Sequence, residues 1–370
     1  MRDRRQARRR WIAPAVAVAA VFMLLPLVFT AKRFHFSHSA ELRSAQSNSL
    51  SPARLTLANA TIDIAFAPGA LELSRDHVLK WITASAQAVA YYYGQFPVPH
   101  VRLLLIPFRG AGVRSGTTYG GQDPLIKVSL GEFTSEAMLQ RDWVMTHEMV
   151  HLAFPSVPQV HHWIEEGLAT YVEPLARHAT GQLSAETVWR DLVEGLPKGL
   201  PEPADKGLGH TPTWGRTYWG GALFCLLADI EIRQKTANRY GLQVALRAII
   251  AAGGTMQVDW PLVRAFETGD QATEVSVLME LYGQMKASPV DVDLALLWQR
   301  LGVEIRGDTV VFHDDASLAA VRHAITPTEP SPRADNDCSQ FYWSTNFPVP
   351  RNFMESHSRS LSMPAADTLC

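Results

Sequence analysis

The sequence has 370 residues, of which 47% are hydrophobic and 19% are charged, as in a globular protein with one large core or two modest ones. Three cysteines, Cys225, Cys338 and Cys370, show no metal-binding spacing, and their odd number argues against a disulfide framework. The net charge is −2, but residues 1–33 hold eight Lys and Arg and one Asp, net +7, so the remaining chain carries −9. This acidic remainder argues against nucleic acid as a partner.

An uncharged stretch near the N-terminus, residues 11–30, follows a head rich in arginine. Its length is about what a helix needs to span a bilayer, and arginines before the span favour a cytoplasmic N-terminus. The stretch is longer than the apolar region of a cleaved signal, and Phe29 fits poorly before a cut after Ala31. We therefore expect a membrane anchor with the following chain on the extracytoplasmic side. Cleavage would instead make the protein secreted.

The chain after the anchor begins with a polar, serine-rich linker over residues 34–54. Hydrophobic periodicity then predicts a mixture of strands and one helix. The expected elements are strands at 61–67, 101–108 and 125–130, a helix at 74–93 and a glycine-rich loop at 109–124.

The second half of the chain has mainly helical patterns, and beyond Thr326 no period remains, which predicts a disordered tail. Helices are expected at 135–153, from Trp163 onward, after Tyr218, at 240–254, within 272–285, at 293–302 and at 316–325, with a hairpin at 303–315. The predicted organisation is a head and anchor at 1–33, a linker at 34–54, a main domain at 55–260, a helical and hairpin extension at 261–326 and a tail at 327–370.

The segment "HEMVH", His147 to His151, has the pattern H-E-x-x-H. Residues four apart lie on one helix face, so the two imidazoles are placed to share one zinc ion. Glu148 points beside such an ion and can act as general base towards a zinc-activated water. A chance match on an amphipathic helix is the alternative, and a catalytic zinc also needs a third protein ligand.

The metzincin pattern is excluded as the source of the third ligand, because its glycine and its third histidine do not follow His151 at the required spacing. Other candidates lie downstream. His161 and His162 fall in a predicted turn and are interpreted as surface or outer histidines. The segment "WIEEGLATYVE", residues 163–173, looks like the start of a second helix beside the first. It offers two adjacent carboxylates, Glu165 and Glu166, after a gap of fourteen residues from the second histidine.

"HEMVH" followed by "WIEEGLATY" resembles the gluzincin zinc metallopeptidases of the aminopeptidase-N-like and glycyl-aminopeptidase-like type, with their peptidase MA-like domain. The resemblance implies that Glu166, directly before Gly167, is the third ligand of one Zn²⁺, with Glu165 as its rival. "TYWGGALFCLLADIEIR" is similar to the family segment whose tyrosine donates to the oxyanion, which implies this role for Tyr218. Packing of Tyr218 on Trp214 or Trp219 is the alternative.

Three departures from this family pattern bear on the substrate and on the orientation of the zinc histidines. The gap before Glu166 is shorter than in aminopeptidase N, and the motif whose glutamate holds a free substrate amine is replaced by "SGTTYGGQDPLIKVSL". Strict aminopeptidase action is therefore in doubt, although the strand at 125–130 could pair with an extended peptide. The usual acid that orients a zinc histidine is also missing, which leaves Thr170 or Glu173 for that role. Possible partners for a substrate carboxylate are Arg114, Lys127 and Arg216.

The resulting expectation is a membrane-anchored zinc metallopeptidase of α+β fold. The fold would be thermolysin-like, with a small mixed sheet that bears an edge strand and a mainly helical C-terminal half. The catalytic domain would span residues 55–260 and cleave a peptide or protein substrate. The alternatives are an inactive binding protein of the same fold and a zinc amidohydrolase that acts on a non-peptide amide. Side-chain preference, the bond position cleaved and the oligomeric state stay open.

Overall fold

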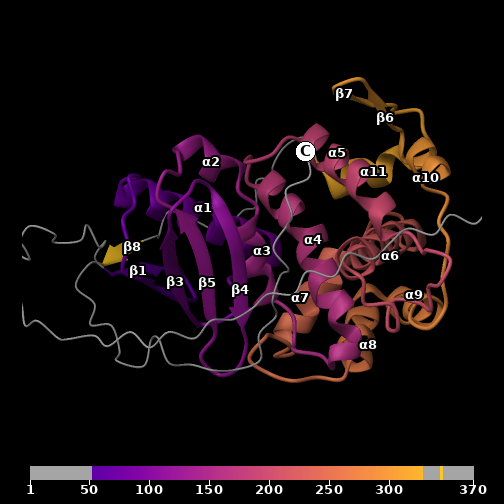
Figure 1. The fold of residues 1–370 in the computed structure, drawn as a ribbon. Coiled ribbons are helices and arrows are strands. Elements are labelled where there is room, and N and C mark those ends of the chain that lie inside the picture. Colours follow the sequence, from indigo (N-terminus) through magenta and orange to yellow (C-terminus); the bar gives the residue numbers. More distant parts are fainter. Residues whose placement is uncertain (1–51, 328–341, 345–370) are drawn as a thin grey trace, which may run out of the picture. The chain divides into compact units, whose positions relative to one another are not determined.

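A mixed sheet and a group of helices make up residues 52–327 and 342–344, the part of the chain that this computed structural model describes (Figure 1). The predicted head and anchor lie outside these residues, as do Cys338 and Cys370. Among the described helices, none combines the length and the apolar character that crossing a bilayer requires. The α+β class, the mixed sheet and the helical C-terminal half are confirmed.

The described residues form a six-stranded sheet in the order β4-β5-β3-β2-β1-β8. Its central strands β2, β3 and β5 run parallel, whereas β4, β1 and β8 are antiparallel to their neighbours. The strands are β1 (Ala53–Thr56), β2 (Thr61–Phe66), β3 (His100–Phe108), β4 (Val113–Tyr119), β5 (Leu125–Gly131) and β8 (Tyr342–Ser344). The strands predicted at 61–67, 101–108 and 125–130 are thus confirmed.

The edge strand beside the helices is β4, and this corrects two predictions. Residues 113–119 were expected inside a loop, and the strand at 125–130 was expected to offer a free edge. In the structure β5 pairs with both β3 and β4, so its two edges are occupied. The residues of β4 that face inward are Gly116 and Thr118, and they lie against the carboxylate of Glu148. The strand therefore lacks the apolar alternation by which strands are predicted from sequence.

The helices follow the predicted order, with two that periodicity did not reveal, α5 and α8. The helices are α1 (Arg75–Tyr93), α2 (Glu136–Arg141), α3 (Val144–His151), α4 (His162–Ala179), α5 (Ala185–Gly195), α6 (Gly221–Lys235), α7 (Leu242–Ala251), α8 (Leu262–Thr273), α9 (Val277–Met285), α10 (Leu294–Leu301) and α11 (Ala319–Ile325). The predicted hairpin is β6 (Val303–Arg306) with β7 (Thr309–Phe312). Short 3-10 turns cover Gln159–His161 and Leu196–Gly199, and a π-helical turn covers Arg216–Gly220.

The single helix predicted at 135–153 is broken into α2 and α3, which is a second correction. Asp142 has an extended backbone with ψ 135° and ends the first helix. Its carboxylate accepts hydrogen bonds from the backbone N–H of Val144 and of Met145, both at 3.1 Å. An aspartate that satisfies the free N–H groups of a first turn stabilises a new helix start. The H-E-x-x-H segment therefore lies on a short helix with its own cap.

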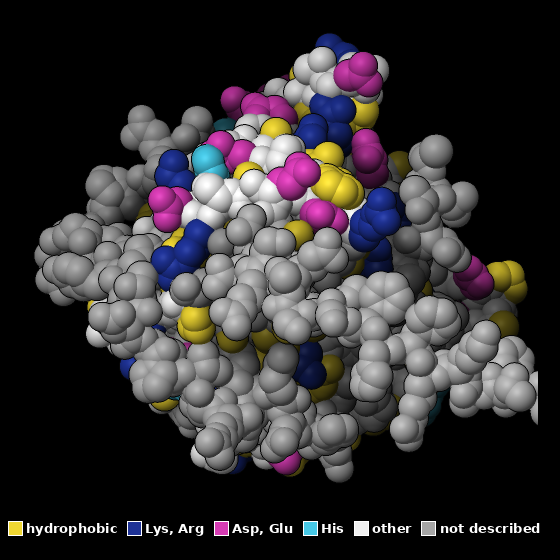
Figure 2. Space-filling model, turned by 60° about the vertical axis from the view of Figure 1, so that its left-hand side comes forward, with side chains coloured by type: hydrophobic (Ala, Val, Ile, Leu, Met, Phe, Trp, Pro, Cys, Tyr) yellow, Lys and Arg dark blue, Asp and Glu magenta, His cyan; other side chains and the backbone are white. Residues whose placement is uncertain are grey.

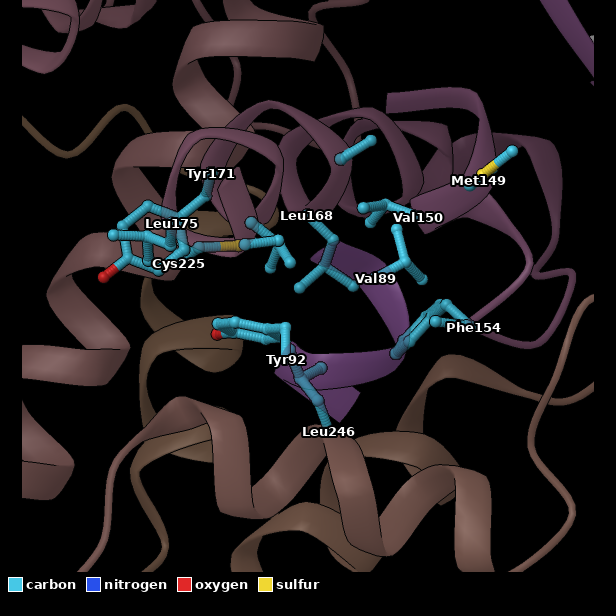
Figure 3. Packing of buried hydrophobic residues seen from close by; sticks show 14 of the residues in the cluster. Val89, Tyr92, Met149, Val150, Phe154, Leu168, Tyr171, Leu175, Cys225 and Leu246 are labelled. Atoms are coloured by element: carbon cyan, nitrogen blue, oxygen red, sulfur yellow. The ribbon is translucent and has the colours of Figure 1, made fainter. Parts of the chain in front are cut away.

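The core lies where α1, α3, α4, α6 and α7 meet, and Figure 3 shows their side chains pointing toward one another. Each fully buried apolar side chain contributes about 1.5–3 kcal/mol relative to exposure. The cluster includes Val89 and Tyr92 of α1, Met149 and Val150 of α3, Leu168, Tyr171 and Leu175 of α4, Cys225 of α6 and Leu246 of α7. Cys225 is buried, as expected for a small core residue.

Two glycines let α4 and α6 come into backbone contact. A methyl group added to Gly167 of α4 would lie 2.3 Å from the carbonyl carbon of Gly221 in α6. One added to Gly221 would lie 2.1 Å from the carbonyl oxygen of Trp163. Since any side chain at these positions would push the helices apart, this close crossing fixes the start of α4 relative to the turn that precedes α6.

The predicted tail at 327–370 falls mostly outside the described residues. Pro327 and Tyr342–Ser344 are the exceptions, and Tyr342–Ser344 pairs with β1 as strand β8, which corrects the prediction of disorder there. On the face of the described part seen in Figure 2, acidic and basic side chains lie beside one another.

Candidate active site

The H-E-x-x-H histidines of α3 and a glutamate of α4 meet at the contact between the two helices. His147 Nε2 lies 3.3 Å from Glu166 Oε2, and His151 Nε2 lies 3.6 Å from the same oxygen. All three side chains are buried, and one ligand atom from each lies within 4.8 Å of the others. Helix α3 holds the histidines one turn apart, and the N-terminal part of α4 brings the carboxylate to them.

This group has the dimensions of a metal site. Ligand atoms about 2.0–2.1 Å from a tetrahedral zinc ion are about 3.3 Å apart, close to the two separations that the structure shows. Two imidazole nitrogens and one carboxylate are also a donor set that zinc prefers. The group could therefore hold a metal ion. Glu165, the rival from the sequence, lies outside it.

The electrostatics of the group suit a cation. Burial lowers the pKa of His151 to about 3, so its imidazole is neutral near pH 7, the form that binds a metal. Burial would raise the pKa of Glu166, but His151 and His147 outweigh it and hold the pKa at about 2. The carboxylate is therefore ionised, and a buried negative charge of this kind favours a positive partner.

Glu148 lies beside this group and contacts the edge strand. The hydroxyl of Thr118 lies 2.7 Å from Glu148 Oε2 and 2.8 Å from the backbone oxygen of the same residue. A methyl group at Gly116 would lie 2.4 Å from Glu148 Cγ, so only glycine leaves room for the carboxylate. Burial raises the pKa of Glu148 to about 7. Strand β4 thus encloses the acidic residue that the sequence pattern places next to the two histidines.

The second oxygen of Glu166 has a partner of its own, His162, the first residue of α4. His162 Nε2 lies 3.3 Å from Glu166 Oε1, and its Nδ1 lies 3.2 Å from Glu165 Oε2. The other oxygen of Glu165 accepts a hydrogen bond from the backbone N–H of Val157 at 3.2 Å. The adjacent glutamates therefore differ in position: one faces the histidine pair, and the other holds the imidazole behind it.

Tyr218 approaches the same histidines from the π-helical turn before α6. Its ring stacks on His147 at 6.3 Å between centroids, with an interplanar angle of 17°. Trp214 also stacks on Tyr218, at 5.9 Å between centroids, so the packing predicted as an alternative is also present. Burial raises the pKa of the Tyr218 phenol, and the nearby Glu166 and Glu148 raise it further. A protonated phenol that lies next to the group can donate a hydrogen bond there.

The expected orienting partner of the two histidines is not found among the described residues. The Nδ1 atoms of His147 and His151 are buried without a hydrogen-bond partner in this part of the chain. Glu173, one of the two predicted partners, receives a hydrogen bond from Arg177 at 2.9 Å instead. Burial would lower the pKa of His147, but Glu166, and to a smaller extent Glu148 and Glu173, outweigh it and raise this pKa.

The three cations considered for a substrate carboxylate have other contacts. Arg216 is buried, with Nε 2.7 Å from Asp205 Oδ2 and a hydrogen bond to the carbonyl oxygen of Gly199. The guanidinium of Arg114 lies over the ring of Phe108 at 3.6 Å. The ammonium of Lys127 lies 4.8 Å from the centroid of the Tyr119 ring. Arg216 is therefore a structural residue of the turn that carries Tyr218.

Comparison with solved structures supports the fold. An aminopeptidase N family protein from Idiomarina loihiensis superimposes with a TM-score of 0.52 at 11% identity, covering 69% of this chain and 50% of that one. An M1 zinc metallopeptidase from Deinococcus radiodurans gives 0.42 at 14% identity, covering 65% and 53%. No protein-family model and no curated protein matches the sequence.

These findings concern the fold alone. The chain spans about half the length of the solved structures that it resembles, and identity is low. At the level of fold, the resemblance to aminopeptidase-N-like proteins inferred from the sequence is confirmed by the Idiomarina structure.

Proposed function

We propose that this protein is a zinc metallopeptidase that hydrolyses peptide bonds. The observation that carries the proposal is the buried group of His147, His151 and Glu166, with both histidine nitrogens 3.3–3.6 Å from one oxygen of Glu166 and Glu148 beside the group. The three would hold one zinc ion, which when bound would supply Lewis acidity to polarise water and the scissile carbonyl. The likeness of the fold to an aminopeptidase N family protein agrees with this function.

The protein's own residues supply the proton chemistry. Glu148 would accept the proton of the attacking water and return it to the departing amine, so one carboxylate serves both halves of the reaction. Tyr218 would donate its phenolic hydrogen to the oxygen on which negative charge develops. The walls of α3, α4 and β4 exclude bulk water from Glu148, which is only 2% exposed. Such exclusion strengthens each of these interactions.

The test is Glu148→Gln, which keeps the size of the side chain and removes the base. We expect one zinc per chain in parent and variant by metal analysis, and a loss of kcat of about 10²- to 10⁴-fold on a peptide library. A variant that cleaves as fast as the parent would show that Glu148 is not the base.

The same experiment separates the alternatives. A parent that binds zinc but cleaves no peptide would favour a binding protein or an amidohydrolase with a non-peptide substrate, and a panel of acylated amines then distinguishes these two. Among cleaved peptides, equal rates with free and acetylated N-termini would indicate endopeptidase action. A strong preference for the free amine would indicate an aminopeptidase.

We also propose that residues 11–30 anchor the protein with its catalytic part outside the cytoplasm. The support is the uncharged span after an arginine-rich head. Membrane fractionation of the parent and of a variant without residues 11–30 tests this proposal. Recovery of the intact parent in the soluble fraction would contradict it.

A further inference from the structure

Strand β4 presents two alternate residues, Gly116 and Thr118, to the carboxylate of Glu148. Side chains two apart on a strand point to the same face, so both act on one neighbour. Gly116 supplies space, since an added methyl group would come within 2.4 Å of Glu148 Cγ and 2.6 Å of Oε1. Thr118 supplies a contact, with its hydroxyl 2.7 Å from Oε2.

We propose that Thr118 is a positioning residue that fixes the carboxylate of Glu148 toward the His147–His151–Glu166 group. Thr118 is 1% exposed and Glu148 2%, so water does not compete with their contact. A hydrogen bond to a buried charged group is stronger than one between neutral groups. The inference rests on the proposed peptidase function, for which Glu148 is the base.

The Thr118 hydroxyl contacts Glu148 at two points. Thr118 has one hydroxyl hydrogen and two acceptors of Glu148 in reach, Oε2 at 2.7 Å and the backbone oxygen at 2.8 Å. The side chain and the backbone of Glu148 are therefore held by the same hydroxyl. Valine has no hydroxyl and could make neither contact.

The test compares Thr118→Val with Thr118→Ser in the full-length protein. Val keeps the shape and removes the hydroxyl, and we expect kcat to fall about 10- to 100-fold with KM nearly unchanged. Ser restores the hydroxyl and should restore kcat to within about threefold of the parent. Zinc content should stay at the parental value in both variants, because neither change touches the metal group.

A matched control is Thr117→Val, on the opposite face of the same strand. The Thr117 hydroxyl contacts only the carbonyl oxygen of Gly116 at 2.7 Å among the described residues, so kcat should not change. A second probe is Gly116→Ala, which should displace the flexible end of Glu148 and lower kcat at unchanged zinc content. It tests whether kcat depends on a fixed position of the Glu148 carboxylate, the premise of the proposal, even if Thr118→Val fails to fold.

The outcomes are distinguishable. An active parent with Thr118→Val at parental kcat, or with no rescue by Ser, overturns the positioning role and leaves the peptidase function standing. A parent that binds zinc but hydrolyses no peptide overturns both. A fall in kcat for Val, rescue by Ser and no effect of Thr117→Val together support the proposal.

Discussion

Gly167→Ala tests the close crossing of α4 and α6, on which the position of Glu166 depends. The new methyl group would lie 2.3 Å from the carbonyl carbon and 2.4 Å from Cα of Gly221, about 1 Å short of the ordinary contact distance of 3.4 Å. Because these are backbone atoms of a packed helix, the two helices must separate. Overpacking costs about 1–3 kcal/mol, and we expect the upper end here.

The helical preference of alanine opposes this cost. Alanine in a helix interior is favoured over glycine by about 1 kcal/mol, so the net loss in the free energy of unfolding should be about 2 kcal/mol. For a folded unit of this size that loss corresponds to a fall in Tm of about 3–4 °C. Glu166 directly precedes Gly167, so zinc affinity should fall as well.

Thermal unfolding followed by calorimetry, together with zinc titration, measures both effects. The matched control is Gly283→Ala in α9, where nothing lies within 4 Å of the added methyl group, and stability should rise by about 0.5–1 kcal/mol. A Gly167→Ala variant that melts at or above the parental temperature with parental zinc affinity would refute the argument from close backbone contact.

Three further predictions concern zinc and pH. His162→Gln should weaken zinc binding about 10- to 100-fold in a chelator competition, because Glu166 loses its second partner. The control His161→Gln should bind zinc as the parent does. A zinc affinity of His162→Gln equal to that of the parent would contradict this role of His162. Chelation should lower Tm. Where free zinc was 100 times Kd, its removal should reduce the free energy of unfolding by about 2.7 kcal/mol, and an unchanged Tm in the presence of chelator would contradict the metal site. Burial would raise the pKa of Asp63, but hydrogen bonds from Arg54 and His100 outweigh it and lower the pKa below its usual range. The stabilisation by this carboxylate is therefore present above the unfolded pKa and is lost as the pH falls through the folded pKa. In urea unfolding, the difference in the free energy of unfolding between the parent and Asp63→Asn should therefore shrink below about pH 4. A difference that stays constant with pH would exclude this contribution.

Local pattern was enough for much of the fold. The strands around Ile64 and Leu104 and the helix that begins after Ser74 have strong apolar periods, and the structure confirms them. Prediction failed where the local signal was weak. Residues 113–119 lack apolar alternation because the inner face of this strand contacts Glu148, and the break at Asp142 depends on two hydrogen bonds that periodicity does not report.

The meeting of His147 and His151 was predictable because helix geometry places them on one face, whereas Glu166 was expected beside them from the resemblance to gluzincin metallopeptidases. The contacts around them were not. Gly116 and Thr118 belong to a segment that reads as a loop, and His162 reads as an outer histidine in a turn. One available signal was the glycine two residues before a threonine, which is consistent with a strand passing close to another side chain.

The sequence by itself determined which chemical groups this protein can use: two imidazoles one helical turn apart, a carboxylate between them and a second helix that starts with two glutamates. Tertiary structure decided which glutamate faces the histidines, because the crossing of α4 and α6 at Gly167 and Gly221 sets the position of the N-terminal part of α4. It also decided that β4 encloses Glu148. Helical spacing is a property of neighbouring residues, whereas the distance between Thr118 and Glu148 depends on how a sheet edge packs against a helix thirty residues away.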